Sequence, residues 1–399
     1  MPKATHSPHL RQPFKRRLVP LYITSFLLIF HAFLVSYINS SYLEQFISTT
    51  AVGTLYTIGA SISIFVFLFI SRVLRRVGNF HLTVGLFIVE FLAVLGMASA
   101  TSLEVAIPLF LVHLITVPLI FFNIDVFIEE IIGNKETVTG SRRGLLLASA
   151  SLIGAISPLT SSFLVDEVTG SFSLVYTVSA LSLVPAFAIL IFYYKNFSDP
   201  AYNEIKLFDA IRFFWQTLNI RFVFLAHFVL QLFFMVMVIY TPLYLTQNIG
   251  FSWKEFGIIM FFAQLAYIIL EYPIGYIADK YIGEKEMMAF GFLVMAIATS
   301  WMSFVTEPSI LLWSFVMFMT RVGASFVEAT TESYFFKKTN STDAQIISFF
   351  RIIRPFSYVF GALLASFVLL YLPFNMLFIV TALLMVPAMF FTLNIEDTK

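Results

Sequence analysis

The chain has 399 residues, of which 59% are hydrophobic and 12% are charged, and its net charge is +1 at pH 7. A soluble domain carries about 25% charged residues, so the composition excludes an ordinary soluble protein. The absence of a basic patch excludes nucleic acid as a partner, and the absence of cysteine excludes disulfides and thiol chemistry. The lipid bilayer is therefore the first partner that we expect.

A helix needs about 20 mainly apolar residues to cross a bilayer. Twelve segments of the chain meet this requirement, so the sequence predicts an all-α integral membrane protein. The first segment is too long for a signal-peptide core, so we expect it to be retained. The predicted spans are 18–40, 48–71, 80–100, 104–128, 144–165, 171–194, 221–246, 253–277, 286–305, 308–331, 344–370 and 373–394.

The longest segment between spans lies at the middle of the chain. It contains Asp199-Pro200, a helix-start pair, and then apolar residues at three- and four-residue steps, which predicts an amphipathic helix on the membrane surface. The expected parts are a tail at 1–17, an N-terminal six-helix bundle at 18–194, a linker helix at 195–220, a C-terminal six-helix bundle at 221–394 and a tail at 395–399.

Lysine and arginine predict the orientation of the chain. They gather in the tails and in alternate links, whereas Lys254 lies on the opposite side and three arginines lie inside spans. Because positive residues favour the cytoplasmic side, we expect both termini in the cytoplasm and the protein in the cell membrane.

The two halves repeat at an offset of 203 to 205 residues, which indicates duplication. Two serines, Ser48 and Ser252, are expected to cap the second helix of their half. The other superimposed pairs are Arg17 with Arg221, Tyr37 with Tyr240, Gly53 with Gly257, Gly78 with Gly283, Asp125 with Glu328, and Glu129 with Glu332.

A short charged link joins the eighth and ninth spans. Its glycines and charges, Gly275, Asp279, Lys280, Gly283 and Lys285, resemble the loop that marks the major facilitator superfamily of transporters. That resemblance implies two six-helix bundles with the substrate held between them near the midplane. It also implies that the acid of this loop latches the cytoplasmic side.

The first-half copy of this loop departs from the family pattern, because Leu74 stands where the acid is expected. Arg75 and Arg76 follow it. Asp343, at the start of the eleventh span, is expected to cap that helix and pair with one of these arginines. The alternative is that both arginines only contact lipid phosphates.

Charged side chains inside spans are expected to face the protein interior, because each costs about 2.5–3.5 kcal/mol at mid-bilayer. Arg321 and Glu328 lie on one stripe of the tenth span, and the eleventh span supplies arginines for ion pairs across the interface. Proton coupling and a static charge network are both consistent with this pattern. The proton-coupling candidates are Asp125, Glu328, Glu332 and Glu129, and the charge-network candidates are Arg321, Arg351, Arg354 and Glu271.

Polar residues on the helices that line the cavity of the resembled family are candidates for the substrate site. A histidine titrates near neutral pH and can bind substrate or proton, although a hydrogen-bonded interior histidine is the alternative for each. Glu90, on a helix that is peripheral in that family, is expected to make a helix–helix contact. The cavity candidates are His31, His113, His227, Gln231 and Tyr358.

The leading functional hypothesis is a monomeric secondary transporter for a small organic solute, coupled to a proton or a sodium ion and without a cofactor. Its aromatic and methionine-rich interior favours an amphiphilic substrate slightly. The alternatives are a symporter or facilitator for a sugar-like nutrient and a receptor or scaffold that kept the fold without transport. Motifs of membrane enzymes are absent from the sequence, so we expect no enzymatic activity.

Overall fold

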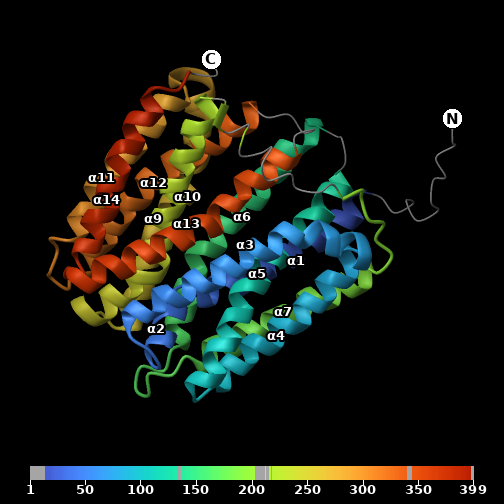
Figure 1. Cartoon of the computed structure of the whole chain (residues 1–399), viewed down its shortest axis with the longest axis horizontal. Helices are drawn as coiled ribbons and strands as arrows, with labels where there is room; N and C mark the ends of the chain where they lie inside the picture. Colours follow the sequence, from blue (N-terminus) through green and yellow to red (C-terminus); the bar gives the residue numbers. More distant parts are fainter. Residues whose placement is uncertain are drawn as a thin grey trace.

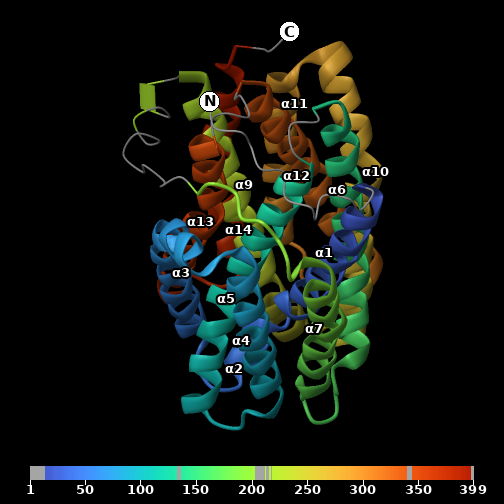
Figure 2. The same ribbon diagram turned by 90° about the vertical axis from the view of Figure 1, so that its right-hand side faces the viewer.

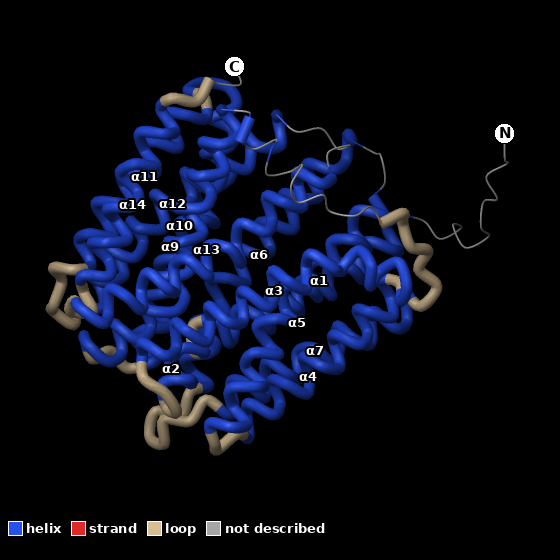
Figure 3. Tube along the Cα trace, in the orientation of Figure 1, coloured by secondary structure: helices blue, strands red, loops and turns tan. Residues whose placement is uncertain are grey.

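The computed structural model describes residues 14–132, 136–202, 212, 215–216, 218–338 and 344–396. Side chains are not described at 14–17, 129, 132, 136–149, 279–280, 336, 338, 344–349 and 351. Within the described residues the chain is helical, with one isolated β-bridge between Asp166 and Ser171 and no strand (Figure 3).

Seven helices form the first half of the described structure, and six helices with two π-helical segments, η2 and η3, form the second. In the first half these are α1 (Phe14–Ser36), α2 (Asn39–Glu44), α3 (Thr49–Val77), α4 (Asn79–Ser99), α5 (Leu103–Ile132), α6 (Glu136–Leu164) and α7 (Ser173–Tyr194). In the second half they are α9 (Leu218–Leu243), η2 (Tyr244–Ile249), α10 (Trp253–Ile277), η3 (Ala278–Ile282), α11 (Glu284–Met302), α12 (Ile310–Lys338), α13 (Ala344–Tyr371) and α14 (Met376–Leu393).

Ten of the described helices are long and apolar enough to cross a membrane. The predicted spans 144–165 and 286–305 fall on α6 and α11, which are not among the ten, so the count of twelve stays a prediction. The described helices expose large apolar side chains, such as Phe192 at 83% and Tyr272 at 82%. Such exposure suits a surface that faces lipid rather than water.

The two halves lie side by side, with α3 and α6 of the first half packed against α13 and α10 of the second (Figure 1). Consecutive long helices alternate in direction. We call the end of the bundle that holds α2 and the links 100–102, 165–172 and 303–309 the distal face. It runs along the lower left of Figure 1, away from the C-terminus, and α2 and the first-half links lie at the lower end of Figure 2.

Matched local features support the predicted duplication. The side chain of Ser48 accepts a hydrogen bond from the Ala51 amide, and Ser252 forms a capping box with Glu255, so both serines cap helices as predicted. Gly78 and Gly283 precede α4 and α11 with φ of 81° and 99°, a conformation that glycine adopts without a steric penalty. Equivalent links of the two halves therefore share one backbone geometry.

Candidate functional site

The two halves approach each other closely at two matched glycines near the distal face. Gly53 on α3 lies against the Tyr240 hydroxyl and Ser366, and Gly257 on α10 lies against Ser162. Neither position has room for a Cβ atom unless its neighbours move. The Ser366 hydroxyl also donates to the Thr50 carbonyl oxygen at 3.2 Å. At both positions the glycine backbone lies directly against side chains of the opposite half.

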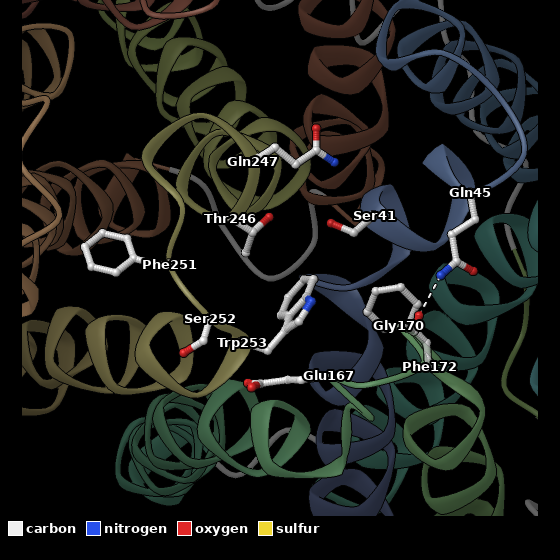
Figure 4. A pocket seen from close by; sticks show the side chains of 10 residues that line it. All are labelled: Ser41, Gln45, Glu167, Gly170, Phe172, Thr246, Gln247, Phe251, Ser252 and Trp253. Carbon is white, nitrogen blue, oxygen red and sulfur yellow. Dashed lines mark hydrogen bonds between the residues drawn. The ribbon is translucent and has the colours of Figure 1, made fainter.

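A pocket of about 460 Å³ lies between the halves at the distal face (Figure 4). Gln247 donates to Glu44 across it, and the Lys254 amide donates to Glu167 at 3.1 Å. The rings of Phe172 and Trp253, one from each half, meet edge to face at 5.3 Å. The pocket is lined by Ser41, Gln45, Glu167, Gly170, Phe172, Thr246, Gln247, Phe251, Ser252 and Trp253.

The link 165–172 that carries Glu167 is shaped by Asp166. Its carboxylate accepts from the Thr169 hydroxyl at 2.6 Å and from the Val168 amide at 3.0 Å. These hydrogen bonds lower the pKa of Asp166 below its usual value, with the Thr169 hydroxyl making the largest contribution. The carboxylate therefore stays ionised and holds the turn beside the pocket.

The interior of the first half contains a cluster that we call the polar core. One carboxylate oxygen of Glu90 on α4 lies 3.0 Å from His31 Nε2 on α1 and 2.6 Å from His113 Nδ1 on α5. Glu90 therefore makes the predicted helix–helix contact, and it brings the two cavity histidines together. The polar core consists of His31, Asn39, Glu90, His113, Tyr176 and Ser179, all of them buried.

Both ring nitrogens of His31 have partners. Its Nδ1 lies 3.1 Å from the Ser179 carbonyl oxygen and 2.8 Å from the Ser179 hydroxyl, and its Nε2 lies 3.0 Å from the Glu90 carboxylate. Buried polar groups are stable when they are hydrogen-bonded, and these contacts hold the His31 ring between α1, α4 and α7.

The other end of the polar core is ordered by Tyr176. The Tyr176 hydroxyl donates to Asn39 Oδ1 at 2.8 Å, which turns the Asn39 amide nitrogen toward His113 Nε2 at 3.4 Å. His113 Nδ1 lies 2.6 Å from Glu90. One carboxylate oxygen of Glu90 is therefore shared by the two histidines.

His31, Glu90 and His113 can also be considered as metal ligands. Their ligand atoms lie within 4.8 Å of one another, and two histidines with one carboxylate is a ligand set that zinc takes. The separations of 2.6 and 3.0 Å from one carboxylate oxygen are hydrogen-bond lengths, however. These lengths favour direct hydrogen bonds between the three side chains over a metal.

A second polar group, which we call the inter-half centre, lies where both halves meet. The phenol oxygen of Tyr37, at the end of α1, accepts from the Gln264 amide on α10 at 3.0 Å and interacts with the Arg321 guanidinium on α12. The Arg321 guanidinium lies 5.4 Å from the Phe233 ring. The inter-half centre consists of Tyr37, Phe233, Gln264, Tyr267 and Arg321, each less than 9% exposed.

The predicted ion pairs between the acids of the tenth span and the arginines of the eleventh stay a prediction, because the side chain of Arg351 lies outside the described residues. Glu328 is half-buried and forms no ion pair there, and Arg354 is exposed and acts on it only at longer range. Helical spacing places residues on one face of a helix, but it does not set the separation between two helices. Glu271 instead accepts from Ser151 of the first half at 3.1 Å.

The structure describes the contacts of the remaining proton-coupling and charge-network candidates only in part. Asp125 is half-buried, and both Asp125 and Glu332 have interaction partners in the structure. The side chains of Glu129 and Arg351 lie outside the described residues. Their predicted roles therefore stay predictions.

The last cavity candidates lie in the second half. His227 Nε2 lies 3.3 Å from the Gln231 amide nitrogen, and the His227 ring packs 4.3 Å from the Phe350 ring. His227 Nδ1 and Gln231 Oε1 are buried without a hydrogen-bond partner among the described residues. The Tyr358 ring lies 6.4 Å from the Tyr56 ring of the first half.

The structure describes the backbone of the link that resembles the family loop. It forms η3 and ends at Gly283, and Gly275 has open space around its Cα. The side chains of Asp279 and Lys280 lie outside the described residues, as does Asp343, so the latch with Arg75 or Arg76 stays a prediction. The Lys285 ammonium lies 3.6 Å from the Glu286 carboxylate.

An acid that the sequence did not reveal lies beside the link between α3 and α4, which is the first-half copy of the resembled loop. Asp199, from the segment between the halves, accepts from the Asn79 amide at 2.7 Å, at the start of α4. A carboxylate is favourable at a helix N-terminus, so Asp199 supplies the charge that Leu74 lacks. Residues 200–202 after it are not helical, and most of the predicted linker helix 195–220 lies outside the described residues.

Comparisons with known proteins agree with this architecture. Residues 222–399 match the family model described as Major Facilitator Superfamily. No curated protein matches the chain. Two solved structures of the nucleoside transporter NupG, one of them a variant, each align with 94% of this chain and 98% of their own, at a TM-score of 0.71 and with 15% and 14% identity. At this identity the likeness shows a shared fold.

Proposed function

We propose that this chain, a protein of the Major Facilitator Superfamily, is a secondary active transporter that moves a small organic solute across a membrane by alternating access. It acts as a monomer in the cell membrane, with both termini in the cytoplasm as the lysines and arginines predict. Nucleosides belong among the solutes to be tested, because the two matched structures are described as a nucleoside transporter.

The matched glycine contacts at the distal face carry this proposal. Gly53 and Gly257 occupy equivalent positions of the two halves, and each lies against the opposite half. A contact between a glycine backbone and side chains of the opposite half can separate and re-form as two rigid bodies rock, because the glycine itself has no side chain to interlock. Together with the hydrogen bonds across the distal pocket, they support a state in which the transporter is closed at this face.

We further propose that a proton is the coupling ion and that Glu328 carries it. Glu328 is half-buried on α12 and has no ion-pair partner among the described residues. Glu271 and Glu332 lie near enough to repel its charge, and Arg354 attracts it only weakly. An acid in this setting can take up and release a proton as the halves move.

Leucine at Gly53 or Gly257 is expected to keep the distal face open. The added side chain meets Tyr240 and Ser366, or Ser162, where no space exists, and such overpacking costs about 1–3 kcal/mol. Gly85→Leu is the matched control, because a Cβ at Gly85 meets no atom within 4 Å. The chain has no cysteine, so spin labels at Thr101→Cys and Thr306→Cys on the distal face report the distance between halves.

The label distance is expected to increase in both leucine variants and to stay unchanged in Gly85→Leu, and solute counterflow in liposomes is expected to fall with it. An unchanged distance in both variants would contradict alternating access through these contacts. A normal distance change without counterflow of any solute would favour the receptor or scaffold alternative.

A further inference from the structure

We propose that Arg321 anchors a binding site for organic anions, small molecules that carry a carboxylate or a phosphate on an aromatic or apolar body. This inference rests on the proposed transport function and names the substrate class of its carrier site.

Arg321 is buried, with 2% of its surface exposed. Its guanidinium donates to the Thr320 hydroxyl at 3.3 Å, interacts with the Tyr37 phenol and lies over the Phe233 ring. These are neutral groups. A guanidinium carries five N–H donors and cannot lose its charge in a protein, so two oxygen neighbours leave both donors and charge unmatched.

The described residues place no carboxylate within ion-pair distance of Arg321. Other buried charges of the chain do have partners there. Glu284 is fully buried and pairs with Lys337 at 2.6 Å, and Glu90 pairs with His31. Since an isolated buried charge is strongly unfavourable, the exception at Arg321 indicates that its counter-charge arrives with a ligand.

The position of Arg321 suits a transported ligand, because residues of both halves surround it. Tyr37 lies in the turn between α1 and α2, and Gln264 and Tyr267 come from α10. Gln264 already donates to the Tyr37 oxygen. The Tyr267 hydroxyl is buried and has no hydrogen-bond partner among the described residues. A ligand oxyanion can accept from both Tyr267 and Arg321.

Aromatic rings around the guanidinium define the rest of the ligand. The Phe234 ring lies 5.7 Å from the Phe233 ring and 6.4 Å from the Tyr267 ring. Such walls favour an aromatic or apolar body, and the planar guanidinium favours the two oxygens of a carboxylate or phosphate. A neutral nucleoside would leave the charge of Arg321 unmatched.

Matched pairs of charged and neutral solutes test this inference on the purified full-length protein. The pairs are benzoate with benzamide and uridine 5′-monophosphate with uridine, and the readout is the dissociation constant from thermal stabilisation. The variants are Arg321→Gln, Arg321→Lys and the control Arg72→Gln, which removes an exposed cation beside Phe69.

In the wild type and in Arg72→Gln, the charged member of at least one pair is expected to bind about tenfold or more tightly than its neutral partner, as a charge-assisted hydrogen bond provides. The ratio is expected to fall to about one in Arg321→Gln and to be partly kept in Arg321→Lys. Equal or weaker binding of the charged member, no binding by any of the four solutes, or an unchanged ratio in Arg321→Gln would overturn the inference.

The spin-label distance in Gly53→Leu separates this inference from the proposed function, because it needs no substrate. If the distance responds and no charge preference is found, the anion site is wrong while alternating access stands. If the distance does not respond, the transport proposal fails as well.

Discussion

The polar core of the first half and the inter-half centre differ in whether their buried charges have ionic partners. In the polar core, Glu90 is paired with His31 and His113, and the partners of all three come from the same half. In the inter-half centre, Arg321 has neutral neighbours from both halves. A charge that is balanced within one rigid body holds that body together, whereas a charge left unbalanced between two bodies is available to a ligand.

Glu90→Leu is expected to have the largest effect on stability. It leaves one ring nitrogen of His31 and one of His113 buried without a partner, and each such loss costs about 1–3 kcal/mol. Thermal unfolding of the purified protein measures the loss. The double variant His31→Leu with Glu90→Leu is expected to lose less than the sum of the two single variants.

Arg321→Leu is the matched control for this comparison, because it removes a buried charge that has no ionic partner. Its unfolding temperature is expected to equal or exceed that of the wild type, since an unpaired buried charge is unfavourable. A loss as large as that of Glu90→Leu would mean that Arg321 has a structural partner, and the contrast between the two regions would disappear.

Tyr176→Phe is expected to have an intermediate effect. It removes the donor that fixes the Asn39 amide and leaves a buried oxygen unsatisfied, which costs about 1–3 kcal/mol. Thermal unfolding of this variant, with Ser182→Ala on the same helix as a control for a local hydroxyl, measures it. No change in Tyr176→Phe would show that the hydrogen bond from Tyr176 to Asn39 does not stabilise the polar core.

Glu328→Gln is expected to have the smallest effect on stability, because Glu328 has no ion pair to lose among the described residues. Its effect is on coupling. Proton-driven uptake is expected to disappear while exchange of solute across the liposome membrane continues. Uptake that still follows the pH gradient in this variant would remove Glu328 as the proton carrier.

The sequence predicted the helices well where capping residues mark them. The predicted span 253–277 coincides with α10, because Ser252 and Glu255 form the capping box at its start. The first predicted span, 18–40, runs too far, since α1 ends at Ser36 and α2 begins at Asn39. A continuous run of apolar residues does not reveal where one helix ends and the next begins.

The contacts between helices could not be predicted from the sequence. Spacing placed Arg321 and Glu328 on one stripe, but it could not show that Arg354 lies too far from Glu328 for an ion pair. His31, Glu90 and His113 come from three helices whose rotations are set by packing. Three ionisable residues within apolar spans of one half were the available signal for that cluster.

The shared carboxylate of the polar core has a consequence for biosynthesis. The ribosome releases His31 before Glu90, which follows 59 residues later. An unsatisfied polar group in the hydrocarbon region of a membrane costs several kcal/mol, so α1 is expected to insert stably only once α4 has arrived. Nascent chains that end before Glu90 are therefore expected to be released from the membrane by alkaline washing more readily than chains that include it.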